Sequence, residues 1–124
     1  MSEVPLFDEQ IRGLEQRPWG CFRVIGDYPD CKIKRLDILP GQRLSLQSHR
    51  HRTEYWVMIR GTATVTLAEE QRELQPGEMI VIPKTAKHRI ENGGHDLVSL
   101  IEVQLGSYFG EDDIVRYADD YQRT

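Results

Sequence analysis

Apolar and polar residues alternate along most of the chain in short segments that end at glycine, proline or acidic turns. The clearest segment is 62–67, where threonine alternates with alanine, valine and leucine. A period of two is typical of a strand with one buried face. Eight or nine such segments follow one another at spacings of about ten residues, which predicts an all-β sandwich or barrel. The predicted strands are 21–25, 31–39, 44–49, 55–59, 62–67, 71–74, 79–82, 88–91 and 97–105.

The two ends of the chain lack this alternation. Residues 1–16 are polar with apolar positions three or four apart, which predicts a short helix or an arm. Residues 111–124 are acidic and polar, which predicts a C-terminal arm or short helix. We therefore expect one β-barrel over 17–110 between two arms. Because no helical segment alternates with the strands, a parallel α/β sheet is not expected.

Composition narrows the class of protein. A chain of 124 residues fits one domain. Its 20 acidic residues outnumber 16 basic ones and give a net charge of −4, which argues against a nucleic-acid partner. No apolar run approaches the roughly 20 residues of a membrane-spanning helix, and the first residues lack a signal-peptide pattern. Two cysteines without C-x-x-C spacing are expected to be reduced thiols, so we predict a cytoplasmic protein without a membrane partner.

One group of residues has the chemistry of a metal site. Gln47, His49 and His51 alternate, so in a strand they point to the same face. Glu54 follows closely, and His88 lies just beyond a turn at Pro83. Imidazole and carboxylate groups that converge in this way suit a divalent first-row metal. A pair of surface histidines is the alternative that spacing alone leaves open.

Two blocks resemble the two motifs of the cupins, which are small antiparallel jelly-roll barrels. In the first block Gln47 occupies the position of the first motif histidine, while Gly41, His49, Glu54 and Gly61 match the pattern at its spacing. Reading His49 and His51 as the histidine pair instead leaves one residue too few before Glu54.

The second block matches the second cupin motif at Gly77, Pro83, His88 and Asn92, with Thr85 at a motif glycine. Together the blocks span residues 41–92. The resemblance implies a cupin double-stranded β-helix, a jelly-roll barrel.

The same resemblance implies a ligand set. Gln47, His49, Glu54 and His88 are expected to hold one divalent metal ion, with His51 close by. An amide oxygen is a weaker donor than imidazole, so Gln47 leaves the preferred ion less defined. Zinc is our first choice, because the zinc shell of type I phosphomannose isomerases is similar, and manganese, iron, cobalt and nickel are the alternatives.

A narrower resemblance covers nearly the whole chain. It is to the type II phosphomannose isomerase domain, which is often fused behind a mannose-1-phosphate guanylyltransferase. This sequence has no Gly-rich phosphate loop ahead of the cupin motifs, so the resemblance implies the isomerase activity, between mannose 6-phosphate and fructose 6-phosphate. Tyr55 departs from the pattern, because the family usually has histidine there. The matching stretches are Arg17-Pro18-Trp19-Gly20, 40–56, Gly61-Thr62-Ala63, His88-Arg89 and 102–116.

Such an isomerisation moves a proton between C2 and C1 through a cis-enediol, and it needs a base, a cation near the sugar oxygens and a phosphate anchor. His51 and Glu102 are alternative bases. Arg89 is a candidate for stabilising the enediolate or holding phosphate, since guanidinium suits phosphate oxygens. Strand alternation opposes that role, because the neighbour of an inward His88 should point outward. Further phosphate candidates are Arg43 and Lys87, with Lys32 and Lys34.

Two other functions are compatible with these residues. One is a different metal-dependent cupin enzyme of the dioxygenase type, with an apolar pocket and a preference for iron. The other is a sugar-binding module without catalysis. For all three we expect a homodimer, because an exposed edge strand invites pairing with a second copy.

Overall fold

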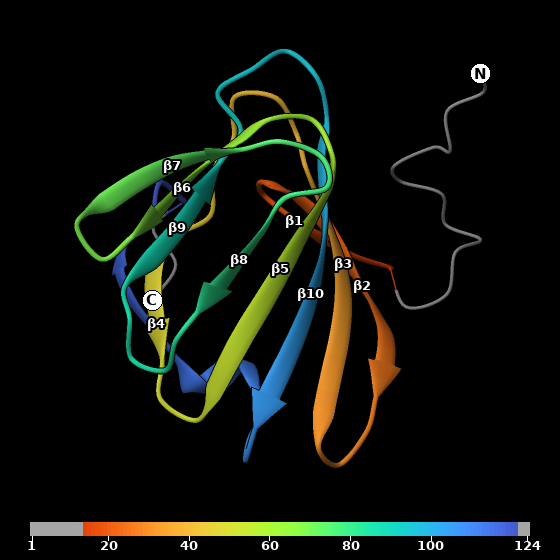
Figure 1. Ribbon diagram of the computed structural model, residues 1–124, viewed down its shortest axis with the longest axis vertical. Coiled ribbons are helices and arrows are strands. Elements are labelled where there is room, and N and C mark those ends of the chain that lie inside the picture. The colour runs from red at the N-terminus through yellow and green to blue at the C-terminus, as the bar shows by residue number, and fades with distance from the viewer. Residues whose placement is uncertain (1–13, 122–124) are drawn as a thin grey trace.

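The computed structural model describes residues 14–121, which form two antiparallel sheets packed face to face (Figure 1). This confirms the predicted all-β class. One sheet has the order β1 (Leu14–Arg17), β2 (Gly20–Asp27), β3 (Cys31–Ile38), β10 (Val98–Gly106), β5 (Arg52–Arg60) and β8 (Met79–Ile82). The other has the order β11 (Ile114–Ala118), β4 (Leu46–His49), β9 (His88–Glu91), β6 (Ala63–Leu67) and β7 (Glu70–Leu74).

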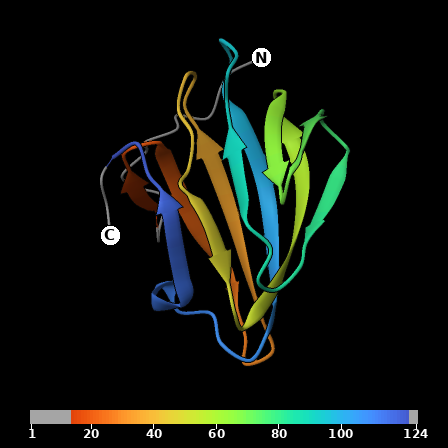
Figure 2. The ribbon, with the colours of Figure 1, turned by 90° about the vertical axis from the view of Figure 1, so that its left-hand side faces the viewer.

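Each of the nine predicted segments overlaps a strand, and two further strands lie nearer the ends of the described residues. β1 pairs with β2, and β11 pairs with β4 after a short 3-10 helix, Glu111–Asp113 (Figure 2). Residues 111–118, in the predicted C-terminal arm, are thus a 3-10 turn and a strand. Most of the predicted N-terminal arm, residues 1–13, lies outside the described residues, as do residues 122–124.

The inner face of the six-stranded sheet changes character along its strands. At one end Leu36, Leu100 and Met58 form a cross-strand row that is buried and apolar. The next row contains Lys34, Glu102 and Trp56, which are also buried. Because buried polar groups are costly unless they are paired, this half of the sandwich must satisfy them locally. The row change marks where the apolar core ends and the candidate site begins.

The turn before β9 carries the departure from the cupin pattern. Thr85 has a φ of 68°, in the left-handed region that favours glycine. Its side chain is exposed, while its backbone N–H donates to the carbonyl of His49 at 2.6 Å. The sequence therefore keeps the turn geometry without the glycine, and this turn ties β9 to the end of β4.

The structure also bears on the two cysteines and on the expectation that no helix spans a membrane. Neither Cys21 nor Cys31 forms a disulfide. Burial is the main cause that raises the pKa of Cys21 to about 11, which keeps it protonated at neutral pH. In residues 14–121 no helix is long and apolar enough to cross a membrane.

Candidate functional site

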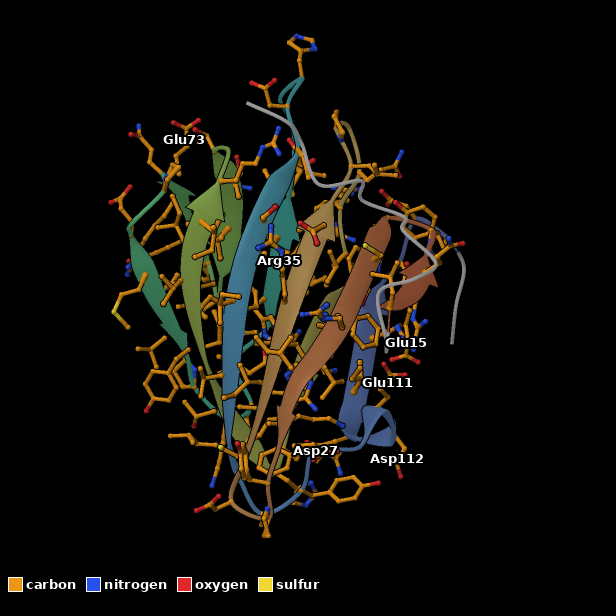
Figure 3. All side chains as sticks on the ribbon, turned by 90° about the vertical axis from the view of Figure 1, so that its right-hand side faces the viewer. Glu15, Asp27, Arg35, Glu73, Glu111 and Asp112 are labelled. Carbon is orange, nitrogen blue, oxygen red and sulfur yellow. The ribbon has the colours of Figure 1, made fainter. Side chains whose placement is uncertain are left out.

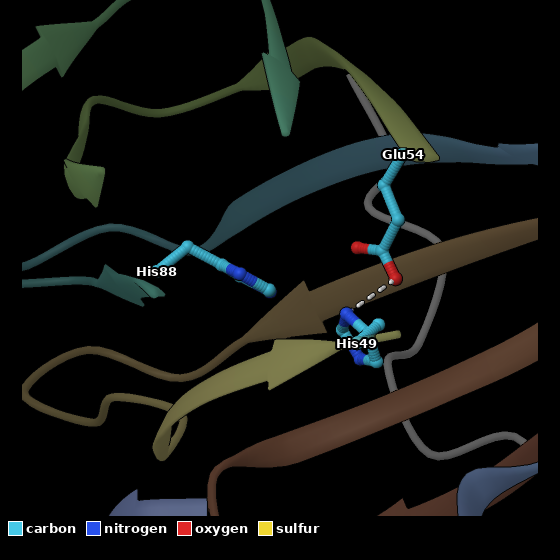
Figure 4. A group of neighbouring side chains, drawn as sticks. All are labelled: His49, Glu54 and His88. Atoms are coloured by element: carbon cyan, nitrogen blue, oxygen red, sulfur yellow. Dashed lines mark ion pairs between the residues drawn. The ribbon is translucent and has the colours of Figure 1, made fainter. Parts of the chain in front are cut away.

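Three predicted metal ligands converge between the two sheets (Figure 4). His49 ends β4, Glu54 lies in β5 and His88 begins β9, so residues from both sheets meet. One ligand atom from each lies within 4.8 Å of the others. All three residues are at most 3% exposed. A buried group of two imidazoles and one carboxylate is the donor set of a divalent metal centre.

The hydrogen bonds of the imidazoles leave nitrogen atoms free for a cation. Nδ1 of His88 lies 3.0 Å from the carbonyl oxygen of Ala86, which can only accept, so Nδ1 carries the proton. Its Nε2 therefore has a lone pair, and this buried atom has no partner in residues 14–121. The Nε2 atom of His49 is buried and without a partner in the same described range. Metal-binding histidines are commonly oriented by such a bond through the second ring nitrogen.

Both imidazoles are neutral at neutral pH. Burial, helped by the positive charge of Arg52 and by His88, lowers the pKa of His49 to about 3. Burial also lowers the pKa of His88. Neutral imidazole is the form that binds a metal ion. The 3.4 Å contact between His49 Nδ1 and Glu54 Oε2 is thus not an ion pair at neutral pH.

Glu54 is held in place by two neighbours on its own strand. The Nε atom of Arg52 donates to Oε2 of Glu54 at 2.8 Å, and the indole Nε1 of Trp56 donates to Oε1 at 3.0 Å. Arg52 is 3% exposed and donates also to the carbonyl of Phe109. The sequence analysis missed Arg52, although its shared strand parity with Glu54 was a usable signal.

Glu102, one of the two candidate bases, lies beside this carboxylate. It accepts from Trp56 Nε1 at 3.2 Å and from Gln104 Nε2 at 3.2 Å. Burial first, and then the negative charge of Glu54, raises the pKa of Glu102 to about 8. Glu102 therefore keeps its proton at neutral pH in the metal-free protein.

A cavity of about 580 Å³, counted with its open mouth, lies over these groups. Gln47, His49, Glu54 and Glu102 line it. Gln47 also pairs with His88 in the β4–β9 register, so the structure brings all four predicted ligands to one place. The cationic lining side chains are Arg17, Lys34, Arg52 and Arg116.

Five predicted site residues are not among the lining residues of this cavity: buried His88, which lies behind His49 and Glu54 in the ligand group, and four others. The side chain of His51 is 54% exposed, and its Nδ1 lies 2.7 Å from Asp113. Arg89 donates to the carbonyls of Leu44 and Ala118. The roles predicted for His51 as a base and for Arg89 at the phosphate or enediolate stay predictions, and the positions of these two side chains do not favour them. Likewise, the guanidinium of Arg43 forms two bonds to Asp120, and the ammonium of Lys87 lies 4.2 Å from the ring centroid of Tyr117.

Solved structures with this arrangement of strands define the fold. KdgF from a Halomonas species superimposes with a TM-score of 0.73 over 89% of this chain and 98% of its own, at 18% identity. Oxalate decarboxylase from Bacillus subtilis gives a TM-score of 0.74 over 83% of this chain and 29% of its own, also at 18% identity. At such identities the likeness concerns the fold alone. The fold is a cupin double-stranded β-helix, as predicted.

The sequence comparison narrows the class to one family. Residues 8–119 match the model of the mannose-6-phosphate isomerase C-terminal family, and the chain belongs to that family. The xanthan biosynthesis protein XanB of Xanthomonas campestris is 47% identical over 108 residues, 87% of this chain and 23% of that protein. The mannose-1-phosphate guanylyltransferase of Escherichia coli K12 is 46% identical, with the same two shares. The alginate biosynthesis protein AlgA of Pseudomonas putida is 41% identical over 98% of this chain and 26% of that protein. The chain thus spans about a quarter of the length of these relatives.

Proposed function

We propose that this chain is a metal-dependent aldose–ketose isomerase that interconverts mannose 6-phosphate and fructose 6-phosphate. The observation that carries the proposal is the buried convergence of His49, Glu54 and His88, of which His49 and Glu54 line a cavity that also contains basic side chains. Membership of the mannose-6-phosphate isomerase C-terminal family supports the substrate class. A sugar phosphate is polar and anionic, and this mixed cavity of acidic and basic groups is suited to it.

Gln47, His49, Glu54 and His88 are the residues that would hold a divalent ion, with zinc as our first choice. The unpartnered Nε2 atoms of both histidines and the carboxylate of Glu54 fit such an ion. A bound divalent ion supplies Lewis-acid polarisation of the sugar oxygens at C1 and C2. Arg52 and Trp56 keep the carboxylate of Glu54 turned toward the two imidazoles.

Glu102 is the group that we propose to move the proton. It lines the cavity, and a group whose pKa is about 8 can both accept and return a proton near neutral pH. To act as the base Glu102 must be ionised, which the positive charge of a bound ion would favour. Its carboxylate would then take the proton from C2 of the aldose and return it to C1 after the cis-enediol forms, while the hydroxyl proton passes from O2 to O1. His51, the other candidate, has its Nδ1 occupied by Asp113 and its side chain largely in solvent.

The test measures the rate at which the protein converts mannose 6-phosphate. The protein is first stripped of metal with a chelator and then reloaded separately with zinc, manganese, iron, cobalt or nickel. We expect turnover with at least one ion, and loss of that turnover in His49→Asn and His88→Asn. An exposed-surface substitution, Glu73→Gln on β7, serves as the matched control. Binding of the sugar phosphate without turnover would favour the sugar-binding module. Oxygen consumption by the iron-loaded chain would favour the dioxygenase type.

The predicted homodimer is part of this proposal. Ile59, Met79, Val81 and Leu105 are exposed apolar side chains on β5, β8 and β10 of the six-stranded sheet. Each follows or precedes a buried residue, so strand alternation directs them to the outer face. A second copy of the chain would cover this face. Sedimentation of the wild type and of Val81→Lys tests it, because a charge at the contact should give monomers.

A further inference from the structure

The cavity that would hold the sugar also contains a cationic corner formed by β1 and β11, the two strands outside the predicted set. Arg116 lies in β11 opposite Gln47 of β4, and Ile114 lies opposite His49. Directly paired residues of an antiparallel ladder have their side chains on the same face. Arg116 therefore faces the cavity directly opposite Gln47 and two residues along β11 from the position opposite His49, and all four residues line the cavity.

The guanidinium of Arg116 has a hydrogen-bond donor that a ligand could use. Its Nε atom is buried and has no hydrogen-bond partner within the part of the chain that the structure describes. A guanidinium donates five hydrogen bonds in a planar fork, and a buried donor without a partner is costly. An anion with several oxygen acceptors would satisfy it.

Arg17 is the second cation of this corner. Its guanidinium carbon lies 4.8 Å from the ring centroid of Phe22, and its Nη2 lies 3.4 Å from Oε1 of Glu111. Figure 3 shows Glu15 and Glu111 near each other on one side of the molecule. Nη2 of Arg17 also lies 3.9 Å from Oε1 of Glu15. The side chain of Glu111 is 53% exposed, so this ion pair is weak and a doubly charged anion can displace it.

The other two lining cations lie beside the acidic groups of the site, Arg52 against Glu54 and Lys34 opposite Glu102 in the β3–β10 register. Arg52 is bound to Glu54 at 2.8 Å and to the carbonyl of Phe109. The ammonium of Lys34 is buried against the ring of Phe22, with its centroid at 4.6 Å. Arg17 itself donates from Nη1 to the carbonyl of Gln16 at 2.9 Å. Arg116, whose buried Nε has no partner in the described residues, is therefore the lining guanidinium with an open donor, and Arg17 is the second guanidinium at this corner.

We propose that Arg116, assisted by Arg17, binds the phosphate monoester of the substrate, while the sugar carbons lie toward His49 and Glu54. This inference rests on the proposed function for the identity of the sugar, but the phosphate site itself can be measured without turnover. It replaces Arg43, Lys87 and Arg89 as the anchor, because those side chains do not line the cavity.

Intrinsic fluorescence can report phosphate binding, because both tryptophans of the chain, Trp19 and Trp56, line the cavity. Titrations use inorganic phosphate, mannose 6-phosphate and unphosphorylated mannose. We expect Arg116→Gln to raise the Kd for inorganic phosphate about tenfold or more, the effect of losing a charge-assisted hydrogen bond. Arg17→Gln should give a smaller increase, and Arg116→Lys an intermediate one, since lysine keeps the charge without the fork. Arg72→Gln, an exposed arginine of β7, is the matched control.

The outcomes separate this inference from the isomerase proposal. Weaker phosphate binding in Arg116→Gln supports the anchor, even where the wild type converts no mannose 6-phosphate. Unchanged phosphate affinity and unchanged KM for mannose 6-phosphate in Arg116→Gln overturn the anchor, even where the wild type is active. No phosphate binding by the wild type, or a larger loss in Arg89→Gln, overturns it too. Partial recovery in Arg116→Lys excludes misfolding as the cause.

Discussion

Glu54 and Glu102 share one hydrogen-bond donor, the indole N–H of Trp56, at 3.0 Å and 3.2 Å. Two neighbouring buried carboxyl groups do not both ionise easily. Arg52 lies against Glu54, so the negative charge belongs there, and Glu102 keeps the proton. The site thus contains one carboxylate suited to a cation and one carboxylic acid suited to proton transfer.

The raised pKa of Glu102 predicts a pH dependence of stability in the metal-free protein. Its pKa rises from an ordinary 4.5 to about 8 on folding, so the folded state holds this proton more tightly than the unfolded state. The contribution of Glu102 to the free energy of unfolding therefore falls as pH rises from 4.5 to about 8. Glu102→Gln, which mimics the protonated acid, should remove this decline in urea-unfolding curves. A decline of equal size in the variant would mean that Glu102 is ionised when folded.

The histidines predict the opposite slope at lower pH. Because the pKa of His49 falls from 6.5 to about 3 on folding, its contribution to stability is present above pH 6.5 and lost as pH falls toward 3. Metal-free His49→Gln should lose less stability than the wild type over that range. Acid unfolding followed by near-ultraviolet circular dichroism measures it. Identical acid midpoints for the two proteins would contradict the assignment of a buried neutral imidazole.

Replacement of Arg52 should destabilise the metal-free protein more than the metal-bound protein. Arg52→Met leaves the carboxylate of Glu54 buried without its strongest partner, and we expect a loss of about 3–5 kcal/mol in the metal-free protein. A divalent ion compensates that charge, so the loss should be smaller with saturating zinc. Urea unfolding with and without zinc measures both values. The same loss in both conditions would argue that Glu54 does not face the ion.

Replacement of Thr85 by glycine should stabilise the folded protein. A β-branched residue at a φ of 68° is strained, and the exposed side chain contributes no core packing. Thr85→Gly should raise the free energy of unfolding by about 1 kcal/mol, the strain relieved less the added entropy of the unfolded chain. Gly77→Ala is the reciprocal control, because Gly77 has a φ of 90° with open space around it, and it should destabilise. A thermal midpoint lowered by Thr85→Gly would count against the strain argument.

Much of the fold could be predicted because each strand carries its own alternation and its own turn signal. β1 and β11 could not, since Leu14–Arg17 and Ile114–Ala118 are short and lie in polar surroundings. Their strand character comes from pairing with β2 and β4, which is a tertiary effect that local patterns do not contain. The segments predicted as arms at the two ends therefore include most of β1 and all of β11.

The predicted metal ligands of the candidate site could be found from the sequence, but most of its cationic residues could not. His49, Glu54 and His88 were found because their spacing matches a motif, and the structure brings them together. Of the basic side chains that line the cavity, Lys34 was among the phosphate candidates. Arg17 and Arg116 were not, because they lie far from the two motifs in sequence. Alternation did indicate correctly that Arg89 lies away from buried His88, since its side chain bonds to Leu44 and Ala118.

The most direct test of metal-dependent isomerisation follows turnover and bound metal in the same samples. Metal-free chain is loaded in steps with the most activating ion, the bound metal is counted per chain, and the interconversion of mannose 6-phosphate and fructose 6-phosphate is measured at each step. If the chain is a metal-dependent isomerase, the rate rises in proportion to bound metal and saturates at one ion per chain. A chain that holds its ion and interconverts neither sugar phosphate would contradict that function.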